Sequence, residues 1–214
     1  MPRTSSLVIV FARAPQPGAA KTRLIPILGR DGAAALHARL VEHTLATAKR
    51  AGVGAVELHG TPAGDRFLGA CATRHGATLK AQVEGDLGER MYAAAVGALN
   101  QHRSVILIGS DCPALEPDQL RTSARLLGEG HDAVLAPAED GGYALIALAR
   151  CDRRLFDGVP WSTSTVMEET RRRLRTLGWC WRELETLWDV DRPTDYRRLV
   201  ESNLLEQPAR SDRL

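Results

Sequence analysis

Three basic side chains stand in a short loop that directly follows the first apolar segment of the chain. The loop reads Arg-Ala-Pro-Gln-Pro-Gly-Ala-Ala-Lys-Thr-Arg, and its cations are Arg13, Lys21 and Arg23. Gly18 lets backbone N–H groups approach an anion closely, and the cations can compensate the negative charge of phosphates. The loop is not a Walker A motif, because Ala20 replaces the glycine before Lys-Thr. We expect a phosphate-binding loop of another type; the alternative is a surface loop with solvated charges.

An aspartate follows a second apolar segment at the equivalent position. In the stretch Ile-Leu-Ile-Gly-Ser-Asp-Cys-Pro, Asp111 comes just after the apolar residues, and Pro113 ends any strand pairing. A carboxylate there could coordinate Mg²⁺ or Mn²⁺ that also binds phosphate oxygens. A turn or helix-capping aspartate is an equally good interpretation of this position alone.

Two further carboxylates occur late in the chain, in the stretch Trp-Asp-Val-Asp-Arg-Pro. Asp189 and Asp191 share a face if this segment is extended, and either could complete a metal site with Asp111. However, Pro193 marks a helix start, so Asp191 could also be purely structural. The pattern favours the metal interpretation and leaves the choice between the two aspartates open.

The remaining candidates lie beside glycines. Glu139-Asp140-Gly141-Gly142-Tyr143 precedes a strand, and its glycines permit close approach of a ligand or simply form a hairpin turn. Asp86 stands between a strand and a helix, where it can cap the helix or help the helix N-terminus face an anion. The six histidines show no spacing typical of a catalytic set, so we interpret them as packing or surface residues.

These residues must be positioned by alternating strands and helices. Apolar runs and turn residues predict strands at 7–12, 55–59, 78–83, 104–108 and 133–136, with helices at 31–51, 65–75, 87–101 and 117–127. Beyond residue 140 they predict strands at 142–148 and 179–186 and helices at 162–177 and 193–204. This rhythm predicts an α/β fold whose parallel sheet is flanked by helices. Ligands of such sheets bind beyond the carboxyl ends of the strands, where the candidate residues fall.

The composition is that of an ordinary soluble protein with one domain. The chain has 214 residues and a formal charge of +2, which provides no basic footprint for nucleic acid or an anionic membrane. Its four cysteines form no metal-ligand spacing, and no apolar stretch is long enough to span a bilayer. We expect one cytoplasmic domain over residues 1–205, followed by a polar tail at 206–214. The basic run at 171–173 is expected to be a solvated helix face.

Taken in order, the motifs resemble a known bacterial family. The set F-A-R-x-P-x-P-G-x-x-K-T-R-L, G-D-L-G-x-R-M, G-S-D-C-P, E-D-G-G-Y, W-S-T and D-V-D-x-P-x-D-Y covers residues 9–196. It resembles a family of the glycosyltransferase-A, or nucleotide-diphospho-sugar transferase, fold that is associated with arsenosugar biosynthesis. The resemblance implies a Rossmann-like, mostly parallel mixed sheet and a divalent metal, Mg²⁺ or Mn²⁺. It also implies a nucleotide or nucleotide sugar and a small-molecule acceptor as ligands.

The resemblance also assigns roles to individual positions. Lys21 and Arg23 would hold phosphates, helped by the rest of the loop, and Asp111 with Asp191 (or Asp189) would hold the metal. Lys21, Asp111 and Asp140 would be the catalytic residues. The nucleoside would lie near Gln82, Gly85 and Asp86, and the acceptor pocket would be bordered by Asp140, Gly141, Gly142, Tyr143 and Trp161.

One departure from the family pattern keeps the reaction type open. Glycosyltransferases of this fold typically carry Asp-x-Asp after the middle strand, whereas only Asp111 is present here, followed by Cys112 and Pro113. The Lys-Thr-Arg-Leu run is also similar to that of phospholactate guanylyltransferases. Glycosyl transfer to a small acceptor is the primary expectation. The alternatives are a nucleotidyltransferase that releases pyrophosphate and a nucleotide-binding protein without catalysis.

Overall fold

A seven-stranded sheet forms the centre of the structure, a computed structural model that describes residues 6–205. The predicted tail at 206–214 lies outside the described residues. The strand order is β3-β2-β1-β4-β6-β5-β7. The strands are β1 (Ser6–Arg13), β2 (Gly54–Thr61), β3 (Thr78–Ala81), β4 (Val105–Gly109), β5 (Ala133–Pro137), β6 (Tyr143–Leu148) and β7 (Trp181–Glu183).

The sheet is mixed, because β6 runs antiparallel to both of its neighbours. The alternation of elements alone predicted a parallel sheet, which is wrong for this strand, whereas the mixed sheet implied by the family resemblance is confirmed. The physical reason is the short connection after β5: the turn containing Gly141 and Gly142 is too short for a crossover and forms a hairpin. All other paired strands are parallel.

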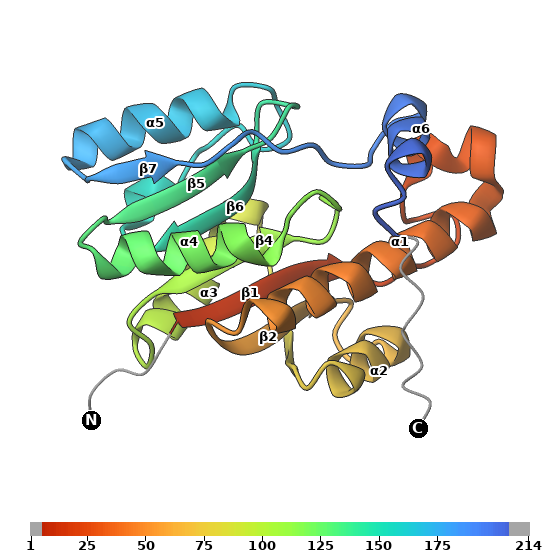
Figure 1. The fold of residues 1–214 in the computed structure, drawn as a ribbon, viewed down its shortest axis with the longest axis horizontal. Coiled ribbons are helices and arrows are strands. Elements are labelled where there is room, and N and C mark those ends of the chain that lie inside the picture. Colours follow the sequence, from red (N-terminus) through yellow and green to blue (C-terminus); the bar gives the residue numbers. More distant parts are fainter. Residues whose placement is uncertain (1–5, 206–214) are drawn as a thin grey trace.

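Helices cover both faces of the sheet (Figure 1). The helices are α1 (Ile25–Ala51), α2 (Arg66–Arg74), α3 (Leu87–Leu99), α4 (Pro117–Gly128), α5 (Val166–Leu177) and α6 (Pro193–Ser202), with single 3-10 turns η1 (Thr22–Leu24) and η2 (Arg153–Leu155). One core cluster joins the sheet to α1, α2 and α4, and a second joins its other face to α3 and α5. None of the helices between residues 6 and 205 is long and apolar enough to cross a membrane.

Helix α1 begins earlier than the sequence pattern predicted. It was expected to open at Asp31, but helical backbone already starts at Ile25, with Pro26 in the first turn. Gly29 then breaks the regular geometry with φ 69° and ψ 172°, so the long helix is kinked there. Asp31 therefore lies near the start of the second helical segment rather than at the start of the whole helix.

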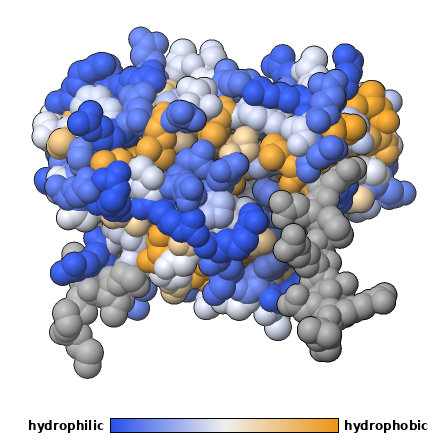
Figure 2. All heavy atoms as spheres, viewed as in Figure 1, coloured by the Kyte–Doolittle hydropathy of each residue, from blue (hydrophilic) through white to orange (hydrophobic). Residues whose placement is uncertain are grey.

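A third, smaller core fixes the late segment of the chain to the loop that follows β1. Trp188, Val190 and Leu199 are buried against Leu24 of η1 and the first half of α1. Figure 1 shows α6 lying beside the beginning of α1, and Figure 2 shows apolar atoms gathering at this end of the molecule. Because buried residues alternate with aspartates here, packing of Trp188 and Val190 turns Asp189 and Asp191 away from this core.

A polar cluster joins α1 to α2. Glu42 accepts hydrogen bonds from the Cys71 thiol and from the His75 ring, and it forms an ion pair with Arg74. Burial would raise the pKa of Glu42, but these partners outweigh it and lower that pKa below its usual range. The carboxylate form is therefore stabilised in the folded protein.

We expect Glu42→Gln to lower the unfolding free energy by about 1 kcal/mol at pH 7. Because the folded-state pKa is depressed, the stabilisation is present above the unfolded pKa and is lost as the pH falls through the folded value. Urea denaturation of both proteins at pH 7 and pH 4 measures it. A difference that grows as the pH falls would contradict this account.

Candidate functional site

Lys21 joins three segments that are remote in sequence. Its ammonium Nζ lies 2.8 Å from Asp111 Oδ1 and donates a hydrogen bond of 2.6 Å to the carbonyl oxygen of Val190. The Lys21 side chain is only 5% exposed, and its backbone adopts a left-handed conformation with φ 49°. Such a conformation is unfavourable for a residue with a Cβ, so the surrounding contacts must hold Lys21 in place. The predicted convergence of the loop, Asp111 and the late segment is therefore present.

Asp111 presents one oxygen inward and keeps the other accessible. Oδ1 has no solvent contact, since it faces Lys21 at 2.8 Å and the His37 ring at 3.6 Å. The side chain as a whole is 49% exposed, so Oδ2 is the oxygen that can meet a ligand. Burial would raise the pKa of Asp111, but Lys21 and His37 hold it well below its usual range. Asp111 is therefore an anion throughout the physiological pH range.

A second carboxylate, Asp189, faces Asp111 and Asp140. Burial, together with the charges of Asp140 and Asp111, raises the pKa of Asp189 to about 6. Backbone hydrogen bonds explain this proximity. Glu139 N–H donates to the carbonyl oxygen of Leu187, and Val190 N–H donates to the carbonyl oxygen of Asp111. The segment from 187 to 190 thus runs between the β5–β6 turn and the end of β4. We call Lys21, Asp111, Asp140 and Asp189 the edge site, because they lie at the carboxyl ends of the parallel strands.

Asp191 has different surroundings from Asp189. Its carboxylate forms an ion pair with Arg23, and its backbone N–H donates to Asp195 at the start of α6. Two of the predicted phosphate ligands, Lys21 and Arg23, are therefore paired with two of the predicted metal ligands. Of the two late aspartates, Asp189 is the one whose charge lacks a cation of its own.

Two arginines, one at the start of the loop and one in α1, form no ion pair with the described residues. Within residues 6–205, the guanidinium groups of Arg13 and Arg30 form no hydrogen bond or ion pair. The Arg30 side chain lies against Gly18, since a Cβ built there would be 3.7 Å from Arg30 Cδ. Gly18 has φ 84°, a conformation that favours glycine. Arg30 was missed in the sequence because it lies beyond the loop, in the kinked part of α1.

The edge site has the donor chemistry that a divalent cation needs. Asp111 Oδ2 and the Asp189 carboxylate are hard oxygen ligands, and the pKa of Asp189 is raised by its burial and by the negative charges of Asp140 and Asp111, which a cation would offset. Among the described residues, no three His, Cys, Asp or Glu side chains are placed to hold a metal by themselves. Mg²⁺ usually takes one or two carboxylates and completes its shell with phosphate and water, so two carboxylates suffice.

The predicted nucleoside residues form a tightly bonded turn between β3 and α3. The Gln82 side chain donates to the carbonyls of Ala12 and His59 and accepts from Arg90, which also donates to the Gly85 carbonyl. The Asp86 carboxylate caps α3 by accepting from Glu89 N–H, and Asp86 N–H donates in return to the Glu89 carboxylate, which completes a capping box. The capping interpretation of Asp86 is thus confirmed, and Gln82 places this turn beside the end of β1.

The predicted acceptor residues lie where the β5–β6 turn meets the start of α5. Tyr143 and Trp161 contact each other edge to face at 6.5 Å between ring centroids. Gly141 packs directly on the Ser164 backbone and accepts from Met167 N–H. The Asp140 carboxylate accepts from Gly142 N–H, so the turn itself orients it. These residues adjoin the edge site through Asp140.

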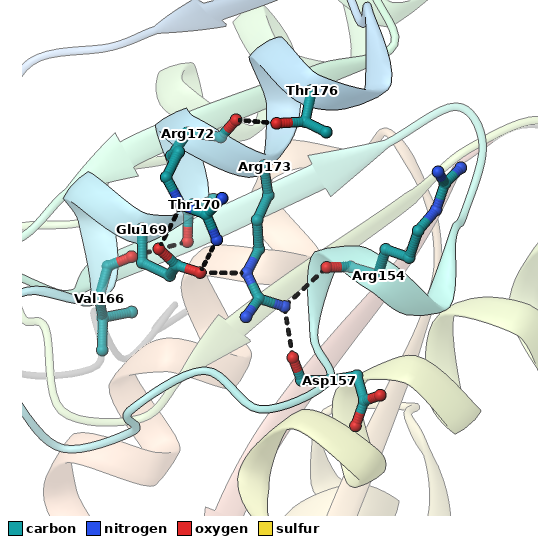
Figure 3. A network of polar contacts seen from close by, with 8 residues as sticks. All are labelled: Arg154, Asp157, Val166, Glu169, Thr170, Arg172, Arg173 and Thr176. Carbon is teal, nitrogen blue, oxygen red and sulfur yellow. Dashed lines mark hydrogen bonds and ion pairs between the residues drawn. The ribbon is translucent and has the colours of Figure 1, made fainter.

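A network of arginines anchors the segment that carries Trp161 (Figure 3). Glu169 on α5 binds Arg172 and Arg173, and these partners lower the pKa of Glu169 to about 2. Arg173 also donates to the carbonyls of Arg154 and Asp157. The solvated helix face predicted for residues 171–173 holds for Arg172, whose side chain is 62% exposed, but not for Arg173, whose side chain is 14% exposed. Arg173 instead fixes the chain on the N-terminal side of Trp161.

The family assignment follows from a match to residues 44–163, more than half of the chain. The matching family is described as "Uncharacterized protein conserved in bacteria (DUF2064)". The chain belongs to this family. A search of curated proteins found no match for this DUF2064 chain.

Solved structures identify the fold of this DUF2064 chain. A candidate nucleotide-diphospho-sugar transferase from Desulfovibrio desulfuricans G20 is 28% identical, with a TM-score of 0.80 over 94% of this chain and 97% of that one. CMP:2-keto-3-deoxy-manno-octonic acid synthetase, solved with CTP, is 13% identical (TM-score 0.62, 95% and 100% covered). Glucosyl-3-phosphoglycerate synthase from Mycobacterium tuberculosis, solved with Mn²⁺ and UDP, is also 13% identical (TM-score 0.57, 95% and 78%). The predicted nucleotide-diphospho-sugar transferase fold is confirmed; a role in arsenosugar biosynthesis stays a prediction.

Gly141 offers a direct test of how tightly the acceptor turn is packed. We expect Gly141→Ala to lower the unfolding free energy by about 2 kcal/mol or more, because its Cβ would overlap the Ser164 carbonyl and its φ is 90°. Gly130→Ala is the matched control, since Gly130 has φ 101° but open space around it. The control should cost about 1 kcal/mol. Equal losses in urea denaturation would show that the Ser164 contact is unimportant.

Proposed function

We propose that this protein transfers a glycosyl group from a nucleotide-activated donor to a small acceptor at the edge site. The supporting observation is the convergence of Lys21, Asp111 and Asp189 at one edge of the sheet, where a loop with unpaired arginines meets accessible carboxylates. Chains with this fold include both glycosyl and nucleotidyl transferases. The chain's own residues must therefore decide between them.

The loop after β1 would bind the donor's phosphates. Arg13 and Arg30 supply positive charge that no carboxylate within residues 6–205 pairs with, and Gly18 allows the backbone to approach a phosphate oxygen. Lys21 would act without direct exposure to the ligand, because its ammonium group is buried between Asp111 and the carbonyl oxygen of Val190. Its charge fixes Asp111 and adds to the positive potential of the loop.

Asp111 Oδ2 and Asp189 would hold a Mg²⁺ or Mn²⁺ ion together with the donor phosphates. When bound, such an ion neutralises the charge of a departing diphosphate. The two carboxylates come from the end of β4 and from the segment before α6, and the small third core holds that segment in place. Glucosyl-3-phosphoglycerate synthase has been crystallised with Mn²⁺ and UDP, which makes Mn²⁺ a suitable probe.

The acceptor side favours a neutral hydroxyl compound. Asp140 and Asp189 make this region anionic, and Tyr143 with Trp161 adds an aromatic surface. An acceptor that is itself a phosphate would be repelled here, whereas a hydroxyl group can donate its proton to Asp140. The acceptor oxygen would then form a bond to the anomeric carbon, while the bond from that carbon to the diphosphate breaks and the nucleoside diphosphate leaves with the electron pair.

Nucleotidyl transfer remains the second candidate because of the single aspartate after β4. Only Asp111 is present there, followed by Cys112 and Pro113, so the metal ligands would come from two separate segments. In that reaction an acceptor oxygen attacks the α-phosphate, and pyrophosphate leaves.

The reaction products distinguish these candidates. The protein and Mn²⁺ are incubated with nucleotide sugars or with nucleoside triphosphates, each with a panel of hydroxyl and phosphorylated acceptors. Acceptor-dependent release of nucleoside diphosphate is the expected result. Release of pyrophosphate would establish the second candidate, and binding without turnover would overturn both.

We expect Asp189→Asn to weaken Mn²⁺-dependent nucleotide binding by at least tenfold while it raises the melting temperature at pH 7. The substitution removes a charge that burial and two carboxylates disfavour, so the folded state gains stability. Isothermal titration calorimetry and thermal melting measure the two effects.

Asp191→Asn is the matched control, because Asp191 lies two residues after Asp189 on the same segment and its carboxylate is already paired with Arg23. It should leave Mn²⁺-dependent binding within about threefold of the unmodified protein, a difference of less than about 0.7 kcal/mol. If Asp191→Asn abolished binding and Asp189→Asn did not, the assignment of the metal ligands would be reversed.

A further inference from the structure

His37 lies behind the edge site, on the side of Asp111 that faces α1. The residue is 5% exposed, and its ring contacts two segments that are otherwise far apart in the sequence. Nε2 lies 2.9 Å from the carbonyl oxygen of Arg13, at the beginning of the loop, and Nδ1 lies 3.6 Å from Asp111 Oδ1. One side chain therefore spans the phosphate side and the carboxylate side of the site.

The atoms that face the ring determine which of its nitrogens must carry a hydrogen. A carbonyl oxygen can only accept, so Nε2 carries a hydrogen and donates it to Arg13. Nδ1 is buried and lies 3.6 Å from the inner oxygen of Asp111, too far for a hydrogen bond, and it has no other partner within the described residues. A carboxylate oxygen also only accepts, so a ring that supports both neighbours carries a hydrogen on each nitrogen. Buried polar atoms are rarely left without a close partner, so an unpartnered nitrogen aimed at a site calls for an explanation.

We propose that His37 is a positioning residue that couples the phosphate loop to Asp111, an inference that rests on the proposed function. With Lys21, it encloses Asp111 Oδ1 and so turns Oδ2 toward the ligand. Through Nε2, the same ring holds the end of β1 at a fixed distance from that carboxylate. The loop that would bind an anion and the carboxylate that would bind a cation are then both held in place by the His37 ring.

His43 shows what a purely structural histidine on the same helix looks like. It is half-buried, and its Nε2 lies 3.1 Å from the Pro113 carbonyl, two residues after Asp111. Its bond goes to the backbone and not to a side chain of the edge site. His43→Gln therefore serves as the control for a histidine of α1 that bonds to a backbone carbonyl.

Two substitutions of His37 separate its two contacts. The amide nitrogen of Asn falls near the position of Nδ1, and that of Gln falls near Nε2. His37→Asn should keep the contact with Asp111 but lose the bond to Arg13, whereas His37→Gln should do the reverse. The probes are Mn²⁺ alone, followed by electron paramagnetic resonance, and pyrophosphate alone, followed by calorimetry.

We expect His37→Gln to weaken Mn²⁺ binding about tenfold and to keep pyrophosphate binding, and His37→Asn to give the opposite pattern. A tenfold change corresponds to about 1.4 kcal/mol. His43→Gln should change neither affinity, even where it lowers the melting temperature as much. If the His37 variants bind both probes as His43→Gln does, the positioning role is overturned. If the unmodified protein binds neither probe, the proposed function fails, and this inference fails with it.

Discussion

The interaction on which the site depends is the buried contact of Lys21 with Asp111 and Val190. Removing charges from water is costly, so a buried ion pair of this kind seldom adds net stability compared with apolar packing. What it provides is position: an ammonium group with two acceptors fixes the loop, the end of β4 and the late segment relative to one another. Removing the Asp111 charge would leave the buried Lys21 ammonium without its counter-charge, so Asp111 supports the fold as well as the chemistry.

Around this contact, some charged side chains are paired with an opposite charge and others are not. The Asp111–Lys21 and Asp191–Arg23 pairs are balanced, whereas Asp189 and Asp140 retain negative charge and Arg13 and Arg30 retain positive charge. Unpaired charges of opposite sign on adjacent segments suit a ligand that brings both signs, such as a metal-bound diphosphate. The raised pKa of Asp189 shows that the folded protein bears a cost for this arrangement, as functional sites often do.

The sequence predicted the order of elements and the gathering of Lys21, Asp111 and the late aspartates, because strand ends in a parallel sheet share an edge. The mixed sheet was predicted by the family resemblance alone, because the alternation of elements does not show that the short turn after β5 makes β6 antiparallel. The start of α1 was not predicted, since it depends on a kink at Gly29. The sequence could not choose between Asp189 and Asp191, because alternation places both on one face and only the partners differ. His37 and Arg30 were missed because their roles arise from tertiary contacts on α1, without a local motif.

A crystal structure with Mn²⁺ and a nucleoside diphosphate tests the central claim most directly, because the anomalous signal of manganese locates the ion without assumptions. The account predicts one anomalous peak in contact with Asp111 Oδ2 and Asp189, at about 2.0–2.3 Å from each oxygen, with the diphosphate beside Gly18 and Arg30. A peak at another part of the molecule, such as the turn that carries Asp86 and Glu89, would contradict it.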